Sequence, residues 1–282
     1  MKMLSRLPAV FVLAAAIIAW AGLAPATLKG GAAAAGKEPS SAGALLDAQL
    51  LRSAYNGGEI MRYLVTWMGV PAGELVMQVI GQENGEGPLE IKVTARSAGL
   101  LAVFYPVEDT FATLVNASSR LPERYEMIQK EGRRQNRKIT VYDQAGGRIT
   151  YRKNSDAPEL FEVDGPVHNE FSSFLFLRVL PFAPGQKSVV PTFADKKRHA
   201  VEVTLEGREA LDTIFGPRNS LQVKPRLTFK GLYQKAGDPL IWLTDDPARI
   251  PVKISAKIVI GSLTARLVEY QGPTGSFRGP EE

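Results

Sequence analysis

Alternating apolar and polar residues recur along most of this chain, and this pattern restricts its fold more than any other feature. In residues 89–96, Leu, Ile, Val and Ala alternate with Glu, Lys, Thr and Arg. A period of two places one kind of side chain on each face of a strand. Asn84-Gly-Glu-Gly87, just before it, is typical of a hairpin turn, because glycine tolerates a positive φ. The pattern therefore predicts antiparallel strands joined by short turns.

Further strand-like segments follow, bounded by turn residues and spaced about 8–12 residues apart. The predicted strands are 61–67, 74–82, 89–95, 110–116, 123–130, 138–143, 148–153, 160–163, 188–193, 199–205, 210–215, 220–229, 240–244, 251–260 and 263–270. This many short strands favours a mainly β fold, in which an antiparallel sheet curls into an incomplete, clamshell-like barrel.

One segment, residues 169–180, breaks the alternation. Asn169 is a residue that caps helices, apolar side chains follow it at helical spacing, and Pro181 ends the segment. We expect a buried helix that packs on or in the barrel. A second short amphipathic helix is predicted over 45–54, before the glycines at 57 and 58.

The first 36 residues have the composition of a bacterial secretory signal peptide. Lys2 and Arg6 precede an apolar run over 7–23, and small-residue exit sites follow. We expect cleavage and release into the periplasm; the alternative is an uncleaved segment that anchors the protein to the inner membrane. The predicted organisation is a signal peptide at 1–36, a flexible linker with a short helix at 37–57, a single β-rich domain at 58–272, and a disordered tail at 273–282.

Charge and cysteine content restrict the function classes. The chain carries 34 basic and 29 acidic residues, but residues 1–36 contain three of the basic residues and no acid, which leaves a net charge of +2 after cleavage. That balance argues against nucleic acid as a partner. The chain has no cysteine, which excludes disulfides, thiolate metal sites and the lipid-bearing cysteine of a lipoprotein. We also expect no stable membrane span after cleavage.

No catalytic motif stands out, and no catalytic residue, metal site or cofactor is predicted. The chain has two histidines, His168 and His199, and we interpret both as capping or surface residues. The most distinctive polar cluster contains Asp245, Asp246 and Arg249. Paired carboxylates can act as acid and base, but this pattern between two prolines is more typical of a structural turn in which Arg249 neutralises the pair.

Two further groups of residues are candidates for binding. Aromatic side chains that could line a pocket for an acyl chain, although such spacings are more typical of a hydrophobic core, are Phe104, Tyr105, Phe171, Phe174 and Trp242. The basic run at 133–138 could bind lipid phosphate or an anionic glycan, but its place between two strands is more typical of a solvated hairpin.

Several stretches resemble a family of bacterial exported proteins, domain-of-unknown-function 3108. They are Gly58-Glu-Ile-Met-Arg-Tyr-Leu-Val-Thr-Trp67, Pro71-Ala-Gly73, Phe104-Tyr-Pro-Val-Glu-Asp109, Glu206-Gly-Arg-Glu209 and Ile241-Trp-Leu-Thr-Asp-Asp-Pro-Ala-Arg-Ile-Pro-Val252. The resemblance covers residues 58–270 and implies an envelope protein, without an assigned reaction or site. Architectural similarity to periplasmic lipoprotein carriers is a further expectation.

Three functional hypotheses follow from the sequence. The first is a non-enzymatic periplasmic protein that binds a lipid or another amphiphile in a barrel-like cavity. The second is a structural or scaffold protein of the envelope with a protein partner. The third, which the sequence favours least, is a hydrolase that uses Asp245 and Asp246.

Overall fold

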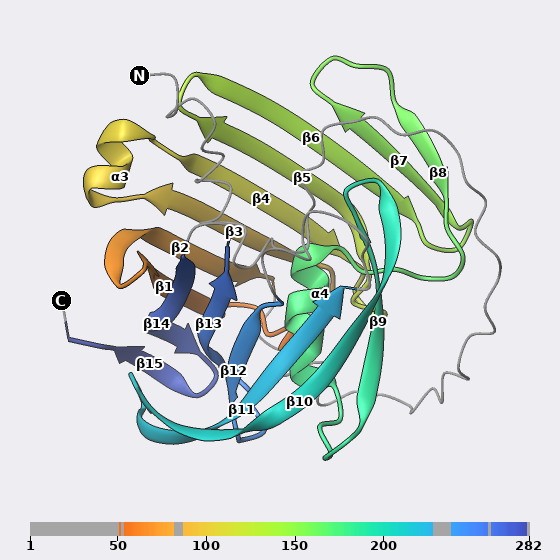
Figure 1. The fold of residues 1–282 in the computed structure, drawn as a ribbon. Coiled ribbons are helices and arrows are strands. Elements are labelled where there is room, and N and C mark those ends of the chain that lie inside the picture. Colours follow the sequence, from red (N-terminus) through yellow and green to blue (C-terminus); the bar gives the residue numbers. More distant parts are fainter. Residues whose placement is uncertain (1–50, 52–53, 82–86, 228–237, 259–260, 281–282) are drawn as a thin grey trace.

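The computed structural model describes residues 51, 54–81, 87–227, 238–258 and 261–280. One antiparallel sheet of fifteen strands dominates it (Figure 1). Its strands are β1 (Ile60–Trp67), β2 (Val70–Ile80), β3 (Leu89–Ser97), β4 (Glu108–Val115), β5 (Pro122–Glu131), β6 (Arg134–Asp143), β7 (Arg148–Lys153), β8 (Glu159–Glu162), β9 (Lys187–Ala194), β10 (Lys197–Thr213), β11 (Gly216–Leu227), β12 (Leu240–Thr244), β13 (Pro251–Lys257), β14 (Ser262–Gly272) and β15 (Gly275–Arg278). The helical segments are α3 (Gly99–Phe104), α4 (Glu170–Phe176) and a 3₁₀ turn, η2 (Leu177–Val179).

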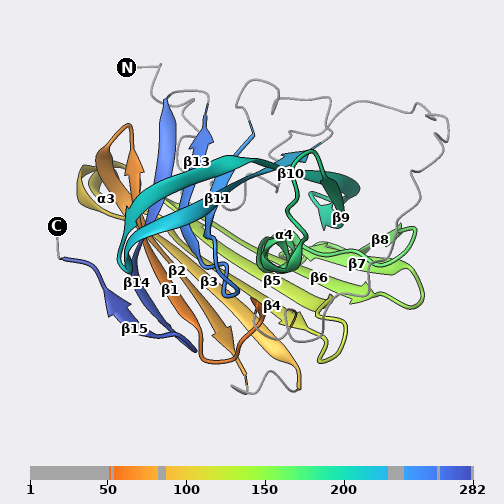
Figure 2. The same ribbon diagram turned by 90° about the horizontal axis from the view of Figure 1, so that it is seen from below.

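The strand order is that of two meanders joined side by side. The strands run β8-β7-β6-β5-β4-β3-β2-β1-β14-β13-β12-β11-β10-β9, and β15 pairs with β14 outside this path. Along this path, neighbouring strands are consecutive in the sequence except at the β1–β14 pair, which joins the two meanders. The two wings curve toward each other, and β8 and β9 remain the two ends of the sheet (Figure 2). This confirms the mainly β, incomplete barrel predicted from the alternation.

Alternating burial along the strands follows from the alternating sequence. In β3 the apolar Leu89, Ile91, Val93 and Ala95 are fully buried, while the polar residues between them stay partly exposed. Register shifts interrupt several pairings, for example between Leu205 and Gly207. Such irregularities bend strands and increase their twist, which suits a strongly curled sheet.

Helix α4 lies on the concave side, between the wing of β10 and β11 and that of β5 and β6 (Figure 2). The predicted cap is present: the side chain of Asn169 accepts a hydrogen bond from the Ser172 backbone N–H, and the Ser172 side chain accepts one from the Asn169 backbone N–H. The Asn169 side chain also donates to Thr113 Oγ1 at 2.7 Å. These contacts hold the start of the helix against β4.

A buried ion pair fixes the end of the helical segment. Arg178, in η2, contacts Glu59 through two hydrogen bonds of 2.6 and 3.0 Å, and both side chains are almost fully buried. The remaining guanidinium N–H groups donate to the backbone oxygens of Ala54 and Ala248, and Tyr270 Oη donates to Glu59. The network joins η2, the chain before β1 and the β12–β13 turn.

The structure departs from the predicted elements at three places. Residues 199–215, predicted as two strands, form mainly one long strand, β10, because the bulge at 205–207 continues the pairing with β11. Residues 273–282, predicted as a disordered tail, include β15, which pairs with β14. Helix α3 was not predicted from the sequence, since residues 99–104 show no helical periodicity.

Some predictions fall outside the described residues. These are the signal peptide at 1–36 and most of the linker and helix predicted over 37–57. Within the part of the chain that the structure describes, no helix has the length and apolar character needed to cross a membrane.

Candidate functional site

The five aromatic residues predicted to line one ligand site lie in three separate places. Phe171 and Phe174, on α4, are buried in the core, where the Phe171 ring lies 5.1 Å from that of Phe111. Trp242 is also buried; its indole N–H donates to Glu209, and the ammonium of Lys253 lies over its ring.

The remaining two residues of the set, Phe104 and Tyr105, lie at the end of α3. Phe104 is 80% exposed, whereas Tyr105 is partly buried and its hydroxyl donates to Glu131 at 3.4 Å. The structure therefore does not assemble the predicted set into one pocket.

The acidic pair forms a turn between β12 and β13. Asp246 Oδ1 accepts hydrogen bonds from the Thr244 hydroxyl and from the backbone N–H groups of Ala248 and Arg249. Asp245 pairs with Arg208 at 3.0 Å. Both carboxylates have structural partners, as the turn interpretation predicts.

Arg249 lies close enough to Asp245 for their charges to interact, but the hydrogen bonds of its guanidinium go to other groups. Its guanidinium donates to the backbone oxygens of Arg178 and Leu180 and lies over the ring of Phe182. The reason is that Arg249 adopts a positive φ of 44° and its side chain contacts the segment after α4. Arg208, on β10, forms the direct ion pair with Asp245.

Both histidines have structural surroundings. His168 is buried, and its Nδ1 lies 3.1 Å from Ser172 Oγ; burial lowers its pKa to about 3, so the ring is neutral. His199 was predicted to be a capping or surface residue, but it is almost fully buried, with Nε2 3.1 Å from the Ala194 carbonyl oxygen.

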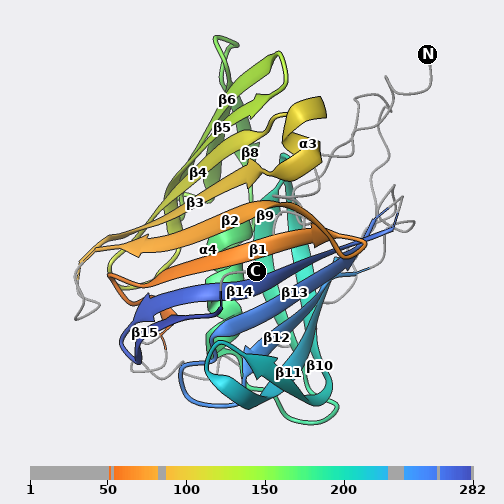
Figure 3. The same ribbon diagram turned by 90° about the vertical axis from the view of Figure 1, so that its left-hand side faces the viewer.

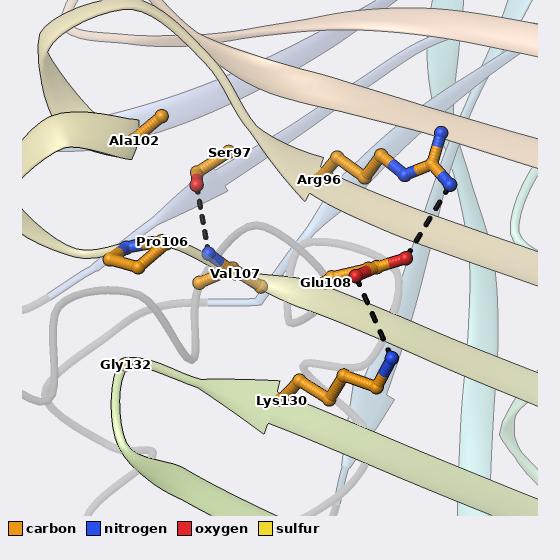
Figure 4. Close-up of a pocket in the computed structure, with 8 residues that line it drawn as sticks. All are labelled: Arg96, Ser97, Ala102, Pro106, Val107, Glu108, Lys130 and Gly132. Atoms are coloured by element: carbon orange, nitrogen blue, oxygen red, sulfur yellow. Dashed lines mark hydrogen bonds and ion pairs between the residues drawn. The ribbon is translucent and has the colours of Figure 1, made fainter.

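A surface depression of about 410 Å³ lies beside α3 (Figure 4). It is lined by Arg96, Ser97, Ala102, Pro106, Val107, Glu108, Lys130 and Gly132. The carboxylate of Glu108 is shared by two cations, Arg96 at 3.6 Å and Lys130 at 3.7 Å, and all three side chains are more than half exposed. Ion pairs this long and this exposed are weak, so both cations are available to an anionic ligand.

Exposed apolar side chains surround the same end of the sheet. Val103 and Phe104, on α3, are 75% and 80% exposed. Met68 and Val70, at the β1–β2 turn, are 65% and 61% exposed. The start of β2, which follows this turn, lies beside α3, because the backbone N–H of Ala98 donates to the carbonyl oxygen of Ala72 (Figure 3). We call these four exposed residues the α3 patch.

Basic side chains border the α3 patch. The β5–β6 turn is held against the chain after α3 by a hydrogen bond from Gly132 N–H to the Pro106 carbonyl oxygen. Its exposed residues Arg133 and Arg134 come from the basic run at 133–138. At the neighbouring β13–β14 end, Lys257 is also exposed. An apolar surface with a basic border is thus formed by residues distant in sequence.

A second, smaller cavity of about 50 Å³ lies on the concave side. Its lining comes from β5, β6, β7, the first turn of α4, the end of β9 and the β9–β10 turn. It consists of Tyr125, Met127, Lys138, Thr140, Tyr142, Tyr151, Glu170, Phe193, Ala194, Asp195 and Lys196. Lys138 therefore departs from the solvated hairpin expected for the basic run: it lies on the concave side, in register with Met127.

The β9–β10 turn closes the rim of this cavity against the opposite wing. Asp195 and Lys196 both adopt a positive φ, as a two-residue hairpin requires. The Lys196 ammonium pairs with Glu159 of β8 at 2.5 Å and lies 4.8 Å from the centre of the Tyr151 ring. The two ends of the open sheet are thus linked by side chains rather than by backbone pairing.

Burial shifts the pKa of several groups in and near the small cavity. It raises the pKa of Glu170 to about 7, with a smaller contribution from the negative charge of Asp195. Burial also raises the pKa of the Asp195 carboxyl and lowers the pKa of Lys138. Nearby, burial together with the charge of Glu131 raises the pKa of Asp109 to about 7.

Sequence reasoning did not identify this group: it assigned no role to Tyr125, Glu170 or Asp195, and it considered Lys138 only as part of the basic run at 133–138. A polar residue at the start of a predicted buried helix, Glu170, was the available signal. Among the described residues, no cluster of three or more His, Cys, Asp or Glu side chains has the arrangement needed to hold a metal ion.

Comparison with known structures supports the fold. The structure is similar to the crystal structure of a β-barrel-like protein of domain of unknown function DUF1849 from Brucella abortus, with a TM-score of 0.53 and 12% sequence identity. The similarity covers 76% of this chain and 97% of the other chain. At this identity the likeness concerns the fold alone.

Comparison of sequences identifies the family. No curated protein matches the chain. The family model described as "Protein of unknown function (DUF3108)" matches residues 62–268, which is most of the chain and overlaps every segment on which the resemblance was based. The chain therefore belongs to the DUF3108 family.

Proposed function

We propose that this chain is a non-enzymatic protein of the bacterial cell envelope, exported to the periplasm, that binds lipids with anionic headgroups at the α3 patch. The observation that carries this proposal is the exposure of Val103 and Phe104 beside a depression with two weakly paired cations. The composition of residues 1–36 supports export.

The apolar part of the patch suits the acyl boundary of a bilayer. Large exposed apolar side chains grouped together, with a polar border, are typical of protein or membrane contact sites. Burying a side chain the size of Phe104 in an apolar environment contributes about 1.5–3 kcal/mol. The four apolar side chains of the α3 patch could therefore be buried together at the surface of a bilayer.

The basic side chains that border the α3 patch favour an anionic headgroup. Arg96 and Lys130 line the depression, and Arg133 and Arg134 lie exposed at the adjacent turn. Each basic residue held near an anionic membrane contributes about 1 kcal/mol. Release of Arg96 and Lys130 from their shared carboxylate costs little, because both pairs are solvated.

The concave side offers a poorer site for an acyl chain. Helix α4 occupies it, and the cavity described there measures about 50 Å³, whereas pockets for molecules of lipid size measure several hundred. We therefore place the lipid contact on the outside, at α3, and not between Phe171 and Phe174.

Co-sedimentation with vesicles tests the proposal. The protein is prepared from residue 37, so that the apolar segment at 7–23 does not itself insert. We expect binding to phosphatidylcholine vesicles that contain phosphatidylglycerol, weaker binding to pure phosphatidylcholine, and loss of the difference at high salt.

Matched variants distinguish binding through the α3 patch from nonspecific binding to vesicles. Phe104→Ser is expected to weaken binding about tenfold or more, because the apolar burial is lost. Val189→Ser, on β9, is the control, since Val189 is also exposed, at 52%, but lies outside the patch. Equal binding by wild type and Phe104→Ser would contradict the proposal.

A further inference from the structure

Two buried oxygen atoms on the concave side lack a hydrogen-bond partner among the described residues. They are Glu170 Oε2 and Tyr125 Oη, and both side chains line the small cavity. Glu170 is 3% and Tyr125 is 6% exposed. A buried polar atom without a partner costs free energy, so native proteins rarely keep one unless a water or a ligand completes it.

The charges around the cavity nearly balance. Glu170 and Asp195 contribute carboxylates, and Lys138 and Lys196 contribute ammonium groups. Lys196 is already paired with Glu159 at the rim. Lys138 and Glu170 both line this space, and their opposite charges attract each other. A cationic ligand would meet Lys138 and an anionic ligand would meet the two carboxylates, so a neutral ligand with hydroxyl groups fits best.

Aromatic rings supply the remaining walls. Tyr125, Tyr142, Tyr151 and Phe193 all line the cavity. The ring of Phe193 contacts that of Tyr142 edge-on, with centroids 6.3 Å apart, and that of Phe161 at 5.6 Å. Ring faces accept the C–H groups of a ligand, while the polar atoms between them fix its orientation.

We propose that this cavity binds the vicinal diol of a polyol or of a terminal sugar residue. A hydroxyl group donates one hydrogen bond and accepts two. One hydroxyl of the diol donates to Glu170 Oε2, and its neighbour accepts from Tyr125 Oη or from Lys138. The cavity of about 50 Å³ has room for a few water-sized groups, which matches a diol unit of four non-hydrogen atoms.

This site is independent of the proposed lipid contact. It lies on the concave side and uses β5–β7, α4 and the β9–β10 turn, whereas the α3 patch lies on the outside at the end of the sheet. Failure of either proposal leaves the other in place.

Saturation-transfer NMR with small hydroxylated probes tests the inference. The probes are 1,2-propanediol, glycerol and D-glucose, and 1-propanol is the matched compound without a vicinal diol. We expect saturable transfer to 1,2-propanediol and glycerol and none to 1-propanol. Tighter binding of glucose than of glycerol would assign the site to a sugar, and the reverse order to a free polyol; both results support the diol site.

Variants locate the binding. Tyr125→Phe and Glu170→Gln are each expected to weaken the binding of 1,2-propanediol about twofold to tenfold. Ser220→Ala is the control, because Ser220 Oγ is the other buried oxygen without a partner in the described chain but does not line the cavity. Circular dichroism shows whether each variant is folded. If Tyr125→Phe or Glu170→Gln does not fold, Lys138→Met is tested in its place.

Two results would overturn the inference. The first is the absence of saturable binding of any diol, or equal binding of 1-propanol. The second is binding that is the same in wild type, Tyr125→Phe, Glu170→Gln and Lys138→Met.

Discussion

Replacing Arg178 by Met should destabilise the protein more than any single surface change. All five N–H groups of the guanidinium are used: two contact Glu59, two contact the Ala248 carbonyl oxygen and one contacts that of Ala54. The variant leaves the Glu59 carboxylate buried, with Tyr270 as its remaining donor. Removing one partner of a buried ion pair costs about 3–5 kcal/mol, because the other charge is left uncompensated.

Urea denaturation followed by circular dichroism measures this loss. A decrease of about 4 kcal/mol should move the midpoint down by more than about 1 M. Arg148→Met is the control: Arg148 pairs with Asp143 at the surface, where the loss should stay below about 1 kcal/mol. The double variant Arg178→Met/Glu59→Leu should recover part of the stability. A cost below about 1 kcal/mol for Arg178→Met would refute the reasoning.

Two further predictions concern the concave side. Burial raises the pKa of Glu170 from 4.5 to about 7, so its contribution to stability is complete below pH 4.5 and is lost as the pH rises through 7. At about 1.4 kcal/mol per pKa unit the full effect is about 3 kcal/mol. Melting at pH 5 and pH 8 should therefore show a smaller decrease in Glu170→Gln than in wild type; parallel decreases would contradict this. Lys196→Met removes the ion pair with Glu159, so amide hydrogen exchange in the β9–β10 turn should accelerate. The free energy of unfolding should fall by less than about 1 kcal/mol, because the pair is exposed. Unchanged exchange in this turn would contradict closure of the rim by this pair.

The sheet was predictable because its local pattern and its burial agree. In β3, the apolar residues Leu89, Ile91, Val93 and Ala95 are those that the structure buries. The capped helix was predictable for the same reason, since Asn169 precedes apolar residues at helical spacing and the structure forms its capping box.

The small cavity was not predictable, because alternation does not say which face of a strand is inward. In β6 the apolar Ile139 and Val141 suggest an inward face, yet Lys138, Thr140 and Tyr142 line the cavity and Val141 is 42% exposed. The choice of face depends on pairing with β5 and on the position of α4, both of which are tertiary.

The α3 patch was only partly predictable. Phe104 was recognised as a candidate for binding, but the short apolar run at 99–104 has no period that distinguishes core from surface. Phe104 is exposed because α3 lies at the end of the sheet, beyond the last paired residues of β3 and β4. Its basic neighbours come from other hairpins, so only the fold brings them together.

Fluorescence from a single label on α3 tests the central claim most directly. The chain has no cysteine, so Val103→Cys gives one attachment point for an environment-sensitive dye such as NBD. Leu160→Cys, on β8, is the control, because Leu160 is also exposed, at 66%, and lies outside the patch. With vesicles that contain phosphatidylglycerol, we predict a blue shift and an intensity increase at position 103 and none at position 160. Equal responses at both positions, or none at 103, would contradict lipid binding through the α3 patch.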